Sequence, residues 1–174
     1  MCLPREIWLQ NGRLYQRPIR ELEQYRRKRV EYRGVPVGEE TVLPGVEGRR
    51  VELLLSVRPA DAQALYQKFT LYFAKNETYH SSISFRPHEC VMKIDRKCSG
   101  SRRAIIHQRR CRVDNPDGKI TMRVILDRFS VEAFINDGRQ VMSAVIMTDQ
   151  DARGISFRAV GKVEMDVVKY DLEV

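Results

Sequence analysis

From residue 51 onward, apolar and polar residues alternate with a period of two, which is typical of β-strands that bury one face. Phe69, Leu71 and Phe73 occupy alternate positions of one such run. Turn-forming residues separate ten candidate strands, at 51–57, 68–74, 79–85, 90–94, 104–113, 120–126, 131–135, 141–147, 155–159 and 163–172. Because no helical pattern intervenes, we expect an all-β fold, a two-layer antiparallel β-sandwich of the jelly-roll or lectin-like kind.

The first fifty residues lack this alternation, and they predict a linker rather than a part of the sandwich. Pro18 suits the first position of a helix, where its missing N–H costs no hydrogen bond. Ile19, Leu22 and Tyr25 then recur at helical spacing, whereas glycines and prolines punctuate residues 34–48. We therefore expect residues 1–50 to be an interdomain linker with one short helix, over about residues 18–29, that packs on a sandwich of residues 51–174.

Composition narrows the classes of protein and of site that this chain of 174 residues can represent. No apolar run approaches the roughly 18 residues that a membrane span needs, so we expect no membrane partner. The start of the chain shows no signal peptide, which is uninformative about secretion because a fragment can lack its leader. The few cysteines suit a cytoplasmic location. The histidines, His80, His88 and His107, are too separated to predict a metal site, and we expect no cofactor.

The four cysteines form neither a zinc-binding pattern nor a disulfide framework. Cys2, Cys90, Cys98 and Cys111 lack the C-x-x-C spacing of a metal site and are sparse for a chain of this length. Reduced, structural thiols are therefore the favoured interpretation. The pairing of Cys90 with Cys98 stays open, because these two residues flank a turn-bearing strand.

Two carboxylates, Asp127 and Glu132, lie close together in the stretch ILDRFSVEAFINDGRQVMSAVIM, residues 125–147. A tight turn at residues 128–130 would place them on neighbouring strands near one end of a sheet, where a catalytic pair is conceivable. However, the Asn136-Asp137-Gly138 turn predicts a β-hairpin, and no substrate clamp accompanies the two acids. We interpret the stretch as a structural hairpin and expect no catalytic residue in this chain.

Three stretches of the chain, taken together, resemble glycoside hydrolase family 32, the family of invertases and fructan hydrolases. LPREIWLQNGRLYQRPIREL, residues 3–22, is similar to the segment that leaves the catalytic domain of these proteins, and ISFRPHECVMKIDRKCSG, residues 83–100, is similar to their middle strands. DRFSVEAFINDG, residues 127–138, resembles their late hairpin, with the motif residues Asp127, Ser130, Glu132, Phe134, Asn136 and Gly138. These matches follow the family order and cover nearly the whole chain.

The resemblance implies a parent enzyme in two parts, of which this chain is the second. Proteins of the family join a catalytic five-bladed β-propeller to a C-terminal β-sandwich. The propeller motifs W-M-N-D-P-N-G, R-D-P and E-C have no counterpart here, since Glu89-Cys90 falls in the sandwich portion. The parent would be a retaining β-fructofuranosidase that hydrolyses sucrose, sucrose 6-phosphate or a fructan, and this chain would be its non-catalytic accessory domain.

The partner implied by the resemblance is the propeller of the same parent protein. We expect the contacts between the two parts to come from Leu3, Pro4, Ile7, Trp8, Ile19, Leu22 and Tyr25. The apolar face that meets the propeller would be exposed in the isolated chain, which favours self-association.

Two alternative functions stay open. The first is a carbohydrate-binding, lectin-like module, an analogy at the level of the fold, for which the available aromatic platforms are Tyr66, Tyr72, Tyr79 and Tyr170. The second is a nucleic-acid-binding domain, suggested by the net charge of +8 and by short clusters of arginine. Because these clusters are scattered along the chain and acids stand near several of them, we regard a solvated basic surface as the better interpretation.

Overall fold

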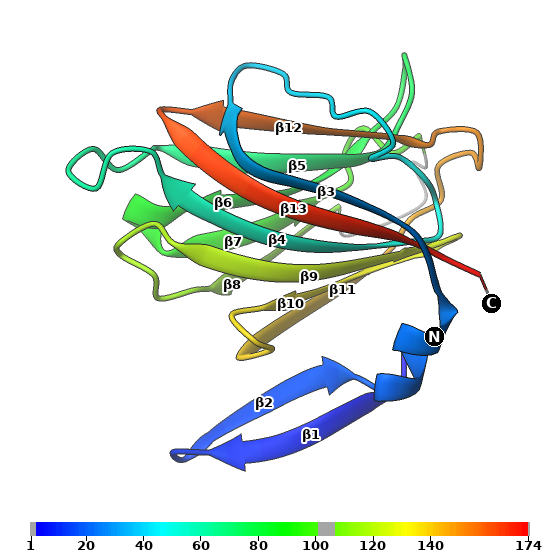
Figure 1. Cartoon of the computed structure of the whole chain (residues 1–174), viewed down its shortest axis with the longest axis horizontal. Helices are drawn as coiled ribbons and strands as arrows, with labels where there is room; N and C mark the ends of the chain where they lie inside the picture. Colours follow the sequence, from blue (N-terminus) through cyan, green and yellow to red (C-terminus); the bar gives the residue numbers. More distant parts are fainter. Residues whose placement is uncertain (1–2, 101–106, 174) are drawn as a thin grey trace.

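The computed structural model describes residues 3–100 and 107–173, which form two antiparallel β-sheets packed face to face and a separate two-stranded hairpin (Figure 1). The six-stranded sheet contains, in spatial order, β11 (Gln140–Val145), β10 (Ser130–Ile135), β9 (Ile120–Asp127), β4 (Val51–Pro59), β13 (Val163–Leu172) and β3 (Arg26–Val37). The five-stranded sheet contains β12 (Gly154–Val160), β5 (Lys68–Lys75), β6 (Ser81–Arg86), β7 (Val91–Asp95) and β8 (Gln108–Arg112). The predicted two-layer antiparallel β-sandwich is confirmed.

Alternate residues of the facing strands fill the space between the two sheets. Leu53 and Leu55 of β4 point inward from the six-stranded sheet, and Phe69 and Leu71 of β5 point inward from the other. The ring of Phe69 stacks on that of Phe157 in β12, with 6.4 Å between the ring centroids. The period-two pattern therefore has the expected cause, because each inward position is one that the core removes from water.

Each of the ten predicted strands corresponds to a strand of the structure, with shifts of a few residues at the ends. The largest difference concerns the run predicted at 104–113, of which residues 104–106 lie outside the described part of the chain. Within the described part, that run forms β8 at Gln108–Arg112. A short 3₁₀ helix, η2 (Pro87–Glu89), joins β6 to β7.

The prediction for the N-terminal region is wrong in its main element. Residues 18–29 do not form one helix: a 3₁₀ helix, η1, occupies only Arg20–Tyr25, and β3 begins at Arg26. The apolar residues Ile19, Leu22 and Tyr25 recur at intervals of three, which matches the three residues per turn of a 3₁₀ helix better than the 3.6 of an α-helix. The 3₁₀ helix ends at Tyr25 because the backbone from Arg26 onward is extended and pairs with β13 as strand β3.

The boundary expected at residue 51 does not separate a linker from the sandwich. β3 pairs with β13 along its length, so residues 26–37 are the edge strand of the six-stranded sheet. Ahead of η1, β1 (Arg5–Gln10) and β2 (Arg13–Pro18) form the separate hairpin, which lies beyond β10 and β11 at the bottom of Figure 1. Ahead of β3, residues 3–25 therefore stand outside the two sheets; we call this segment the N-terminal arm.

Three further predictions concern features other than the strands. Among the described residues, none forms a helix long and apolar enough to cross a membrane. Cys90, Cys98 and Cys111 are free thiols. No group of three or more His, Cys, Asp or Glu side chains suited to a metal ion occurs within residues 3–100 and 107–173.

Candidate interdomain surface

The N-terminal arm is attached to the outer face of the six-stranded sheet through a small second hydrophobic cluster. Leu22 of η1 packs there with Ile125 of β9, Phe134 of β10 and Leu172 of β13, and Leu3 joins them from the start of the arm. Ile125 and Phe134 alternate with core residues and point away from the main core. Apolar residues on the outer face of these two strands thus form the surface against which the arm packs.

A buried ion pair joins β1, the first strand of the arm, to β10 of the six-stranded sheet. Arg5 Nη2 donates to Glu132 Oε2 at 2.6 Å and to Ser143 Oγ at 2.9 Å, and the backbone N–H of Leu3 donates to Glu132 Oε1 at 2.6 Å. The Glu132 side chain is 2% exposed. The Arg5 guanidinium also lies 5.4 Å from the centroid of the Phe134 ring. Both carboxylate oxygens of Glu132 are therefore occupied by groups of the arm.

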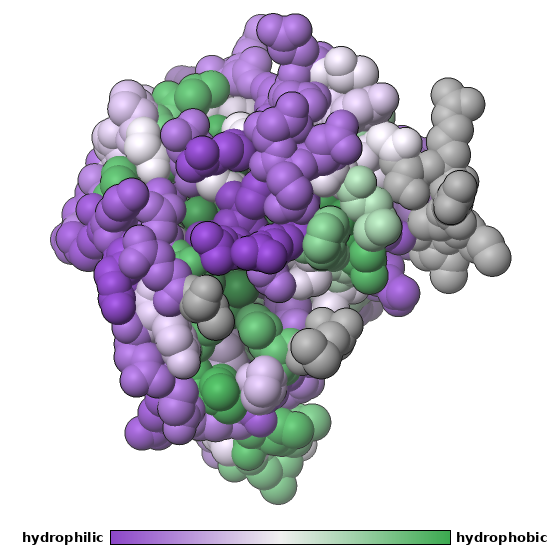
Figure 2. Space-filling view, turned by 90° about the vertical axis from the view of Figure 1, so that its right-hand side faces the viewer, coloured by the Kyte–Doolittle hydropathy of each residue, from purple (hydrophilic) through white to green (hydrophobic). Residues whose placement is uncertain are grey.

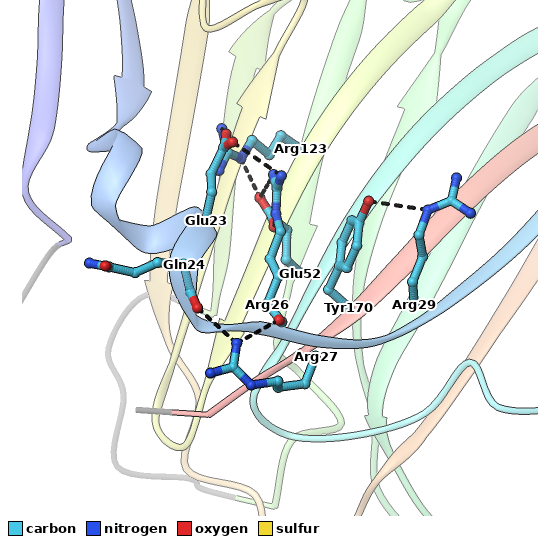
Figure 3. Close-up of polar contacts among 8 residues, drawn as sticks. All are labelled: Glu23, Gln24, Arg26, Arg27, Arg29, Glu52, Arg123 and Tyr170. Carbon is cyan, nitrogen blue, oxygen red and sulfur yellow. Dashed lines mark hydrogen bonds and ion pairs between the residues drawn. The ribbon is translucent and has the colours of Figure 1, made fainter.

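A second buried carboxylate, Glu52 of β4, holds the start of β3 and the middle of β9 together (Figure 3). Arg26 donates to Glu52 through Nε at 2.5 Å and through Nη2 at 3.1 Å, and Arg123 Nε donates to Glu52 Oε1. Glu23 of η1 lies within 3.5 Å of both guanidinium groups. Since the Glu52 side chain is fully buried, this cluster fixes where the arm leaves the sheet.

The charges in this cluster act on the pKa of Arg26. The hydrogen bond to Glu52 raises the pKa of Arg26 above its ordinary value, and the nearby Glu23 carboxylate acts in the same direction. Arg26 also lies over the ring of Tyr170, 4.8 Å from the ring centroid. The charge of Arg26, the first residue of the basic run 26–29, is therefore paired within the protein and is not available to an external partner.

The turn between β10 and β11 contacts the second strand of the arm. The backbone N–H of Gln16 donates to the carbonyl of Gly138 at 3.0 Å. Gly138 has a φ of +84°, and a Cβ built on it would lie 1.6 Å from the Gln16 carbonyl oxygen. A side chain at this position would displace the arm, so only glycine fits here.

The predicted hairpin motif is present, and its residues divide into three structural roles. Glu132 and Phe134 hold the arm, as described above. Asn136 and Gly138 build the β10–β11 turn, where Asn136 Oδ1 accepts from the Thr121 N–H at 3.3 Å. Asp127 and Ser130 face each other across the tight β9–β10 turn. Asp127 and Glu132 both border an open pocket of about 970 Å³. Asp127 is exposed there, whereas Glu132 is buried and bound to Arg5, so the two acids lie in different environments.

One face of the arm hairpin is apolar and uncovered. Ile7, Leu9 and Leu14 are 62%, 72% and 53% exposed. They share one face because Leu9 pairs with Leu14 across the hairpin and Ile7 lies two residues before Leu9. Figure 2 shows green, hydrophobic atoms at the bottom of the molecule, the end where the hairpin lies.

The opposite face of the hairpin is aromatic and basic. Trp8 stacks on Tyr15 of the paired strand, with 5.5 Å between their centroids, and Arg17 lies 5.2 Å from the Trp8 ring. Trp8 also borders a cleft of about 610 Å³ between the hairpin and the outer face of the six-stranded sheet. The floor and rim of this cleft include Leu54, Ser56, Arg123, Phe134, Asp137 and Asp166. Arg123 Nη2 is buried beside it without a hydrogen-bond partner among the described residues.

The residues predicted to make interdomain contacts occupy different environments. Ile7 is exposed, Tyr25 is 37% exposed and Pro4 is also exposed. Trp8, Leu3 and Ile19 are half-buried, whereas Leu22 is 9% exposed inside the second cluster. Leu22 is thus used within this chain and offers little surface to a partner.

The sequence prediction missed two exposed residues of the hairpin, Leu9 and Leu14, and it missed the hairpin itself. A usable signal was present, because Asn11-Gly12 connects the two strands and Asn-Gly favours the two-residue turns of β-hairpins. Both residues have positive φ, +50° and +71°. The prediction also missed Glu52, whose carboxylate stands in the otherwise apolar stretch VELLL.

Comparison with known proteins agrees with the fold and the motif. The family model of the glycosyl hydrolases family 32 C terminal matches residues 21–174. A sucrose-6-phosphate hydrolase of Staphylococcus xylosus is 31% identical over 99% of this chain, and a raffinose invertase of Escherichia coli is 31% identical over 91% of it. The chain spans about a third of the length of these relatives, 34% and 31%.

Solved structures show the same fold at lower sequence identity. An exo-inulinase from Aspergillus awamori matches with a TM-score of 0.81 and 18% identity, over 99% of this chain and 35% of that one. A fructan 1-exohydrolase IIa from Cichorium intybus matches with a TM-score of 0.84 and 16% identity, over 98% of this chain and 40% of that one. Since the family model covers nearly all of the sandwich and the arm meets it through the predicted hairpin motif, this chain belongs to the C-terminal domain family of the family 32 glycosyl hydrolases.

Proposed function

We propose that this chain is the non-catalytic accessory domain of a β-fructofuranosidase, a retaining hydrolase of sucrose, sucrose 6-phosphate or a fructan. The observation that carries the proposal is the match of the family's C-terminal model to residues 21–174, in a chain that spans a third of its enzyme relatives. The names of those relatives, sucrose-6-phosphate hydrolase, raffinose invertase and levanase, support this substrate class. The chemistry would take place in an N-terminal five-bladed propeller.

The N-terminal arm is the part of the chain that we assign to the contact with the propeller. Its uncovered face consists of Ile7, Leu9 and Leu14, and burying such side chains against a partner is favourable by about 25 cal/mol per Å² of apolar surface. The arm is also held in one position, because Arg5 and Glu132 join it to the sandwich. A rigid apolar face loses little conformational entropy on binding, which favours a stable contact between domains.

The experiment is a fusion of the catalytic part of the Staphylococcus xylosus sucrose-6-phosphate hydrolase to this chain, assayed for sucrose 6-phosphate hydrolysis and for thermal stability. We expect the fusion to be active and to melt at a higher temperature than the catalytic part alone. The triple variant I7D/L9D/L14D should lose this gain. The matched control is V42D, because Val42 is 65% exposed and lies in the connection between β3 and β4, outside the arm.

Three results would contradict parts of the proposal. A fusion no more stable than the catalytic part alone would remove the accessory role. A triple variant that behaves like V42D would place the contact elsewhere than on the arm. Hydrolysis of sucrose by the isolated chain would show that the chain is itself catalytic.

A carbohydrate-binding role is the second candidate, supported by the cleft beside Trp8. Its volume of about 610 Å³ lies in the range of small-molecule sites, and its wall combines an aromatic ring with polar side chains. The tyrosines are weaker platforms, because Tyr66 is 1% exposed and Tyr72 packs edge-on against His80. Calorimetric titration of the chain with sucrose, inulin and levan should give saturable heat that W8A abolishes. The absence of heat at millimolar sugar would eliminate this candidate.

We also propose a cytoplasmic location for the parent protein. Supporting it, Cys90, Cys98 and Cys111 are free thiols, the state that a reducing compartment maintains. Fractionation of the source cells, with detection of the protein in the cytoplasmic fraction, is the measurement that checks it. Recovery of the protein from the medium would contradict it.

A further inference from the structure

The outer face of the five-stranded sheet is strongly basic, and it lies on the opposite side of the sandwich from the N-terminal arm. Strand alternation and register place six cations on this face: Lys68, Arg86, Lys93, Arg110, Arg112 and Arg158. Three of them have carboxylate partners within 3.1 Å, namely Arg86 with Glu89, Lys93 with Asp95 and Arg112 with Asp114. Among the described residues, the other three have no ion-pair partner, so the face carries excess positive charge.

Part of this excess charge gathers around a small pit. The pit has a volume of about 40 Å³ and is lined by Ser84, Arg86, Glu89, Val91, Lys93 and Arg110. Ser84 of β6, Lys93 of β7 and Arg110 of β8 stand opposite one another in consecutive strand pairs, so their side chains share a row across the sheet. Like charges in directly opposite positions repel each other, and Lys93 and Arg110 are such a pair. Asp95 pairs with Lys93 and offsets part of this repulsion, whereas Arg110 has no carboxylate partner among the described residues.

The cations at the pit have N–H groups to spare. Arg86 donates from Nη1 to Glu89 at 2.8 Å, and Lys93 donates to Asp95 at 2.8 Å. Arg110 makes a single long contact, 3.5 Å from Nη2 to Gln108 Oε1. Since an arginine has five N–H donors and a lysine has three, most donors of this trio are unused by the described residues. The pit is thus lined by three cations with unused donors and by one carboxylate, Glu89, whose charge is offset by Arg86. Such donors suit an oxyanion.

The positive field extends beyond the pit to Lys68 of β5. The backbone of Lys68 pairs with β12, but its side chain has no hydrogen-bond or ion-pair partner among the described residues. Burial lowers the pKa of Lys68 below its ordinary value, and the charges of Lys93 and Arg86 lower it further. The nearby Asp95 carboxylate acts in the opposite direction but does not cancel the effect. Glu89, Asp95 and Asp114 pair with other cations of this face, and Glu40, which lies near Arg158, pairs with Lys75. Within the described part of the chain, Lys68 and Arg110 therefore keep their charges without a direct carboxylate partner.

We propose that Arg86, Lys93 and Arg110 form a binding site for a phosphate-type oxyanion, either free inorganic phosphate or the phosphate group of a small phosphomonoester. The pit is far smaller than the 300–1,000 Å³ typical of sites that enclose a drug-sized ligand, so it takes the charged group and leaves an ester's organic part in solvent. Arg86 and Arg110 supply planar guanidinium groups suited to two oxygens each, and Lys93 supplies a point charge between them. The site goes beyond the proposed accessory role.

The test is a titration of the intact chain with inorganic phosphate, glucose 6-phosphate and glucose, followed by backbone amide NMR shifts. Chloride keeps the ionic strength constant, because screening alone alters exposed charges. We expect saturable shifts at β6, β7 and β8 with one or both phosphates and none with glucose. Tighter binding of glucose 6-phosphate would identify a monoester as the ligand, and tighter binding of inorganic phosphate would identify the free ion.

Two variants and a control separate a site from a general charge effect. K93Q and R110Q should each weaken phosphate binding by at least about tenfold, since each removes charge-assisted hydrogen bonds. R33Q is the control: it removes the same charge from the edge strand β3, where the Arg33 side chain is 80% exposed. Shifts that do not saturate, or R33Q weakening binding as much as R110Q, would overturn the proposal. A single cooperative thermal transition in each unliganded variant would show that all three are folded.

Discussion

Arg5 and Glu132 lie 127 residues apart in the sequence, yet Arg5 Nη2 is 2.6 Å from Glu132 Oε2 in a site where the carboxylate is 2% exposed. This contact joins the N-terminal arm to the strand that carries the family motif. The glutamate of that motif therefore serves to position the arm, and through the arm the proposed face toward the propeller. Both carboxylate oxygens of Glu132 accept hydrogen bonds from the arm, which supports a structural role for this residue of the motif.

The first prediction concerns this ion pair. Replacing Glu132 by Gln leaves Arg5 partly buried without a counter-charge, and replacing Arg5 by Gln leaves the Glu132 carboxylate buried without one. Each substitution should lower the free energy of unfolding by about 3 kcal/mol. The double variant should cost clearly less than the sum, and urea unfolding of all four proteins measures the coupling. Additive effects within about 0.5 kcal/mol would show that the pair contributes no specific coupling.

The second prediction concerns Glu52, which serves two arginines at once. E52Q removes the counter-charge of Arg26 and Arg123 together, so it should cost about 3–5 kcal/mol of unfolding free energy. The matched control is E173Q, because Glu173 is 58% exposed and lies 3.8 Å from Arg27. Exposed pairs of this kind contribute about 0–1 kcal/mol. A similar loss in both variants, measured by urea unfolding, would contradict the role given to burial.

The β-strands could be predicted from the sequence because the cause of their pattern is local. Phe69, Leu71 and Phe73 alternate in the chain because one face of β5 is removed from water, and no knowledge of the partner strand is needed to recognise this. The hairpin motif was predictable for a similar reason. Asn136, Asp137 and Gly138 all have positive φ in the turn, a conformation for which these residue types have the lowest cost.

The arm and the buried charges could not be derived from local pattern in the same way. The partner residues of Glu52 lie 26 and 71 positions away, so nothing near it in the sequence marks it as buried and paired. β3 was mistaken for the end of a helix because its residues 26–29, RRKR, are polar and show no alternation. It is an edge strand, where burial is incomplete and the usual signal is weak.

The third prediction is that the isolated chain associates through the arm. Ile7, Leu9 and Leu14 present a contiguous apolar face that no described residue covers. Light scattering after size-exclusion chromatography should show a mass that rises with protein concentration, and I7D/L9D/L14D should be monomeric. The V42D variant should associate like the unmodified chain. A chain that is monomeric at high concentration would contradict this prediction.

The fourth prediction uses the depressed pKa of His80. Burial lowers the pKa of His80 below its ordinary value of 6.5, and the charge of Lys75 lowers it further, although Asp95 acts in the opposite direction. The unfolded chain therefore binds a proton at His80 at a higher pH than the folded chain does. Protonation of His80 therefore favours the unfolded chain. The folded protein keeps its full stability with respect to His80 above pH 6.5, and it loses stability as the pH falls from 6.5 toward the lower pKa of the folded state.

Substitution isolates this effect from that of the carboxylates. H80Q should show a smaller loss of unfolding free energy between about pH 7 and pH 5 than the unmodified chain, measured by urea unfolding at each pH. H88Q is the control, because His88 is exposed on η2. Equal pH dependence of the two variants would show that burial of His80 has no part in the acid sensitivity.

The fifth prediction compares two glycines with similar backbone conformations and different surroundings. Gly34 has a φ of +59° with nothing within 4 Å of an added Cβ, whereas at Gly138, with a φ of +84°, the added Cβ would lie 1.6 Å from the Gln16 carbonyl. G34A should cost only the backbone strain, about 1–2 kcal/mol. G138A should cost more and should also free the arm, since the Gln16 N–H bond to Gly138 cannot survive the displacement. Trypsin cleavage after Arg13 at the hairpin tip should accelerate in G138A and stay unchanged in G34A, and equal cleavage rates would refute the close contact between turn and arm.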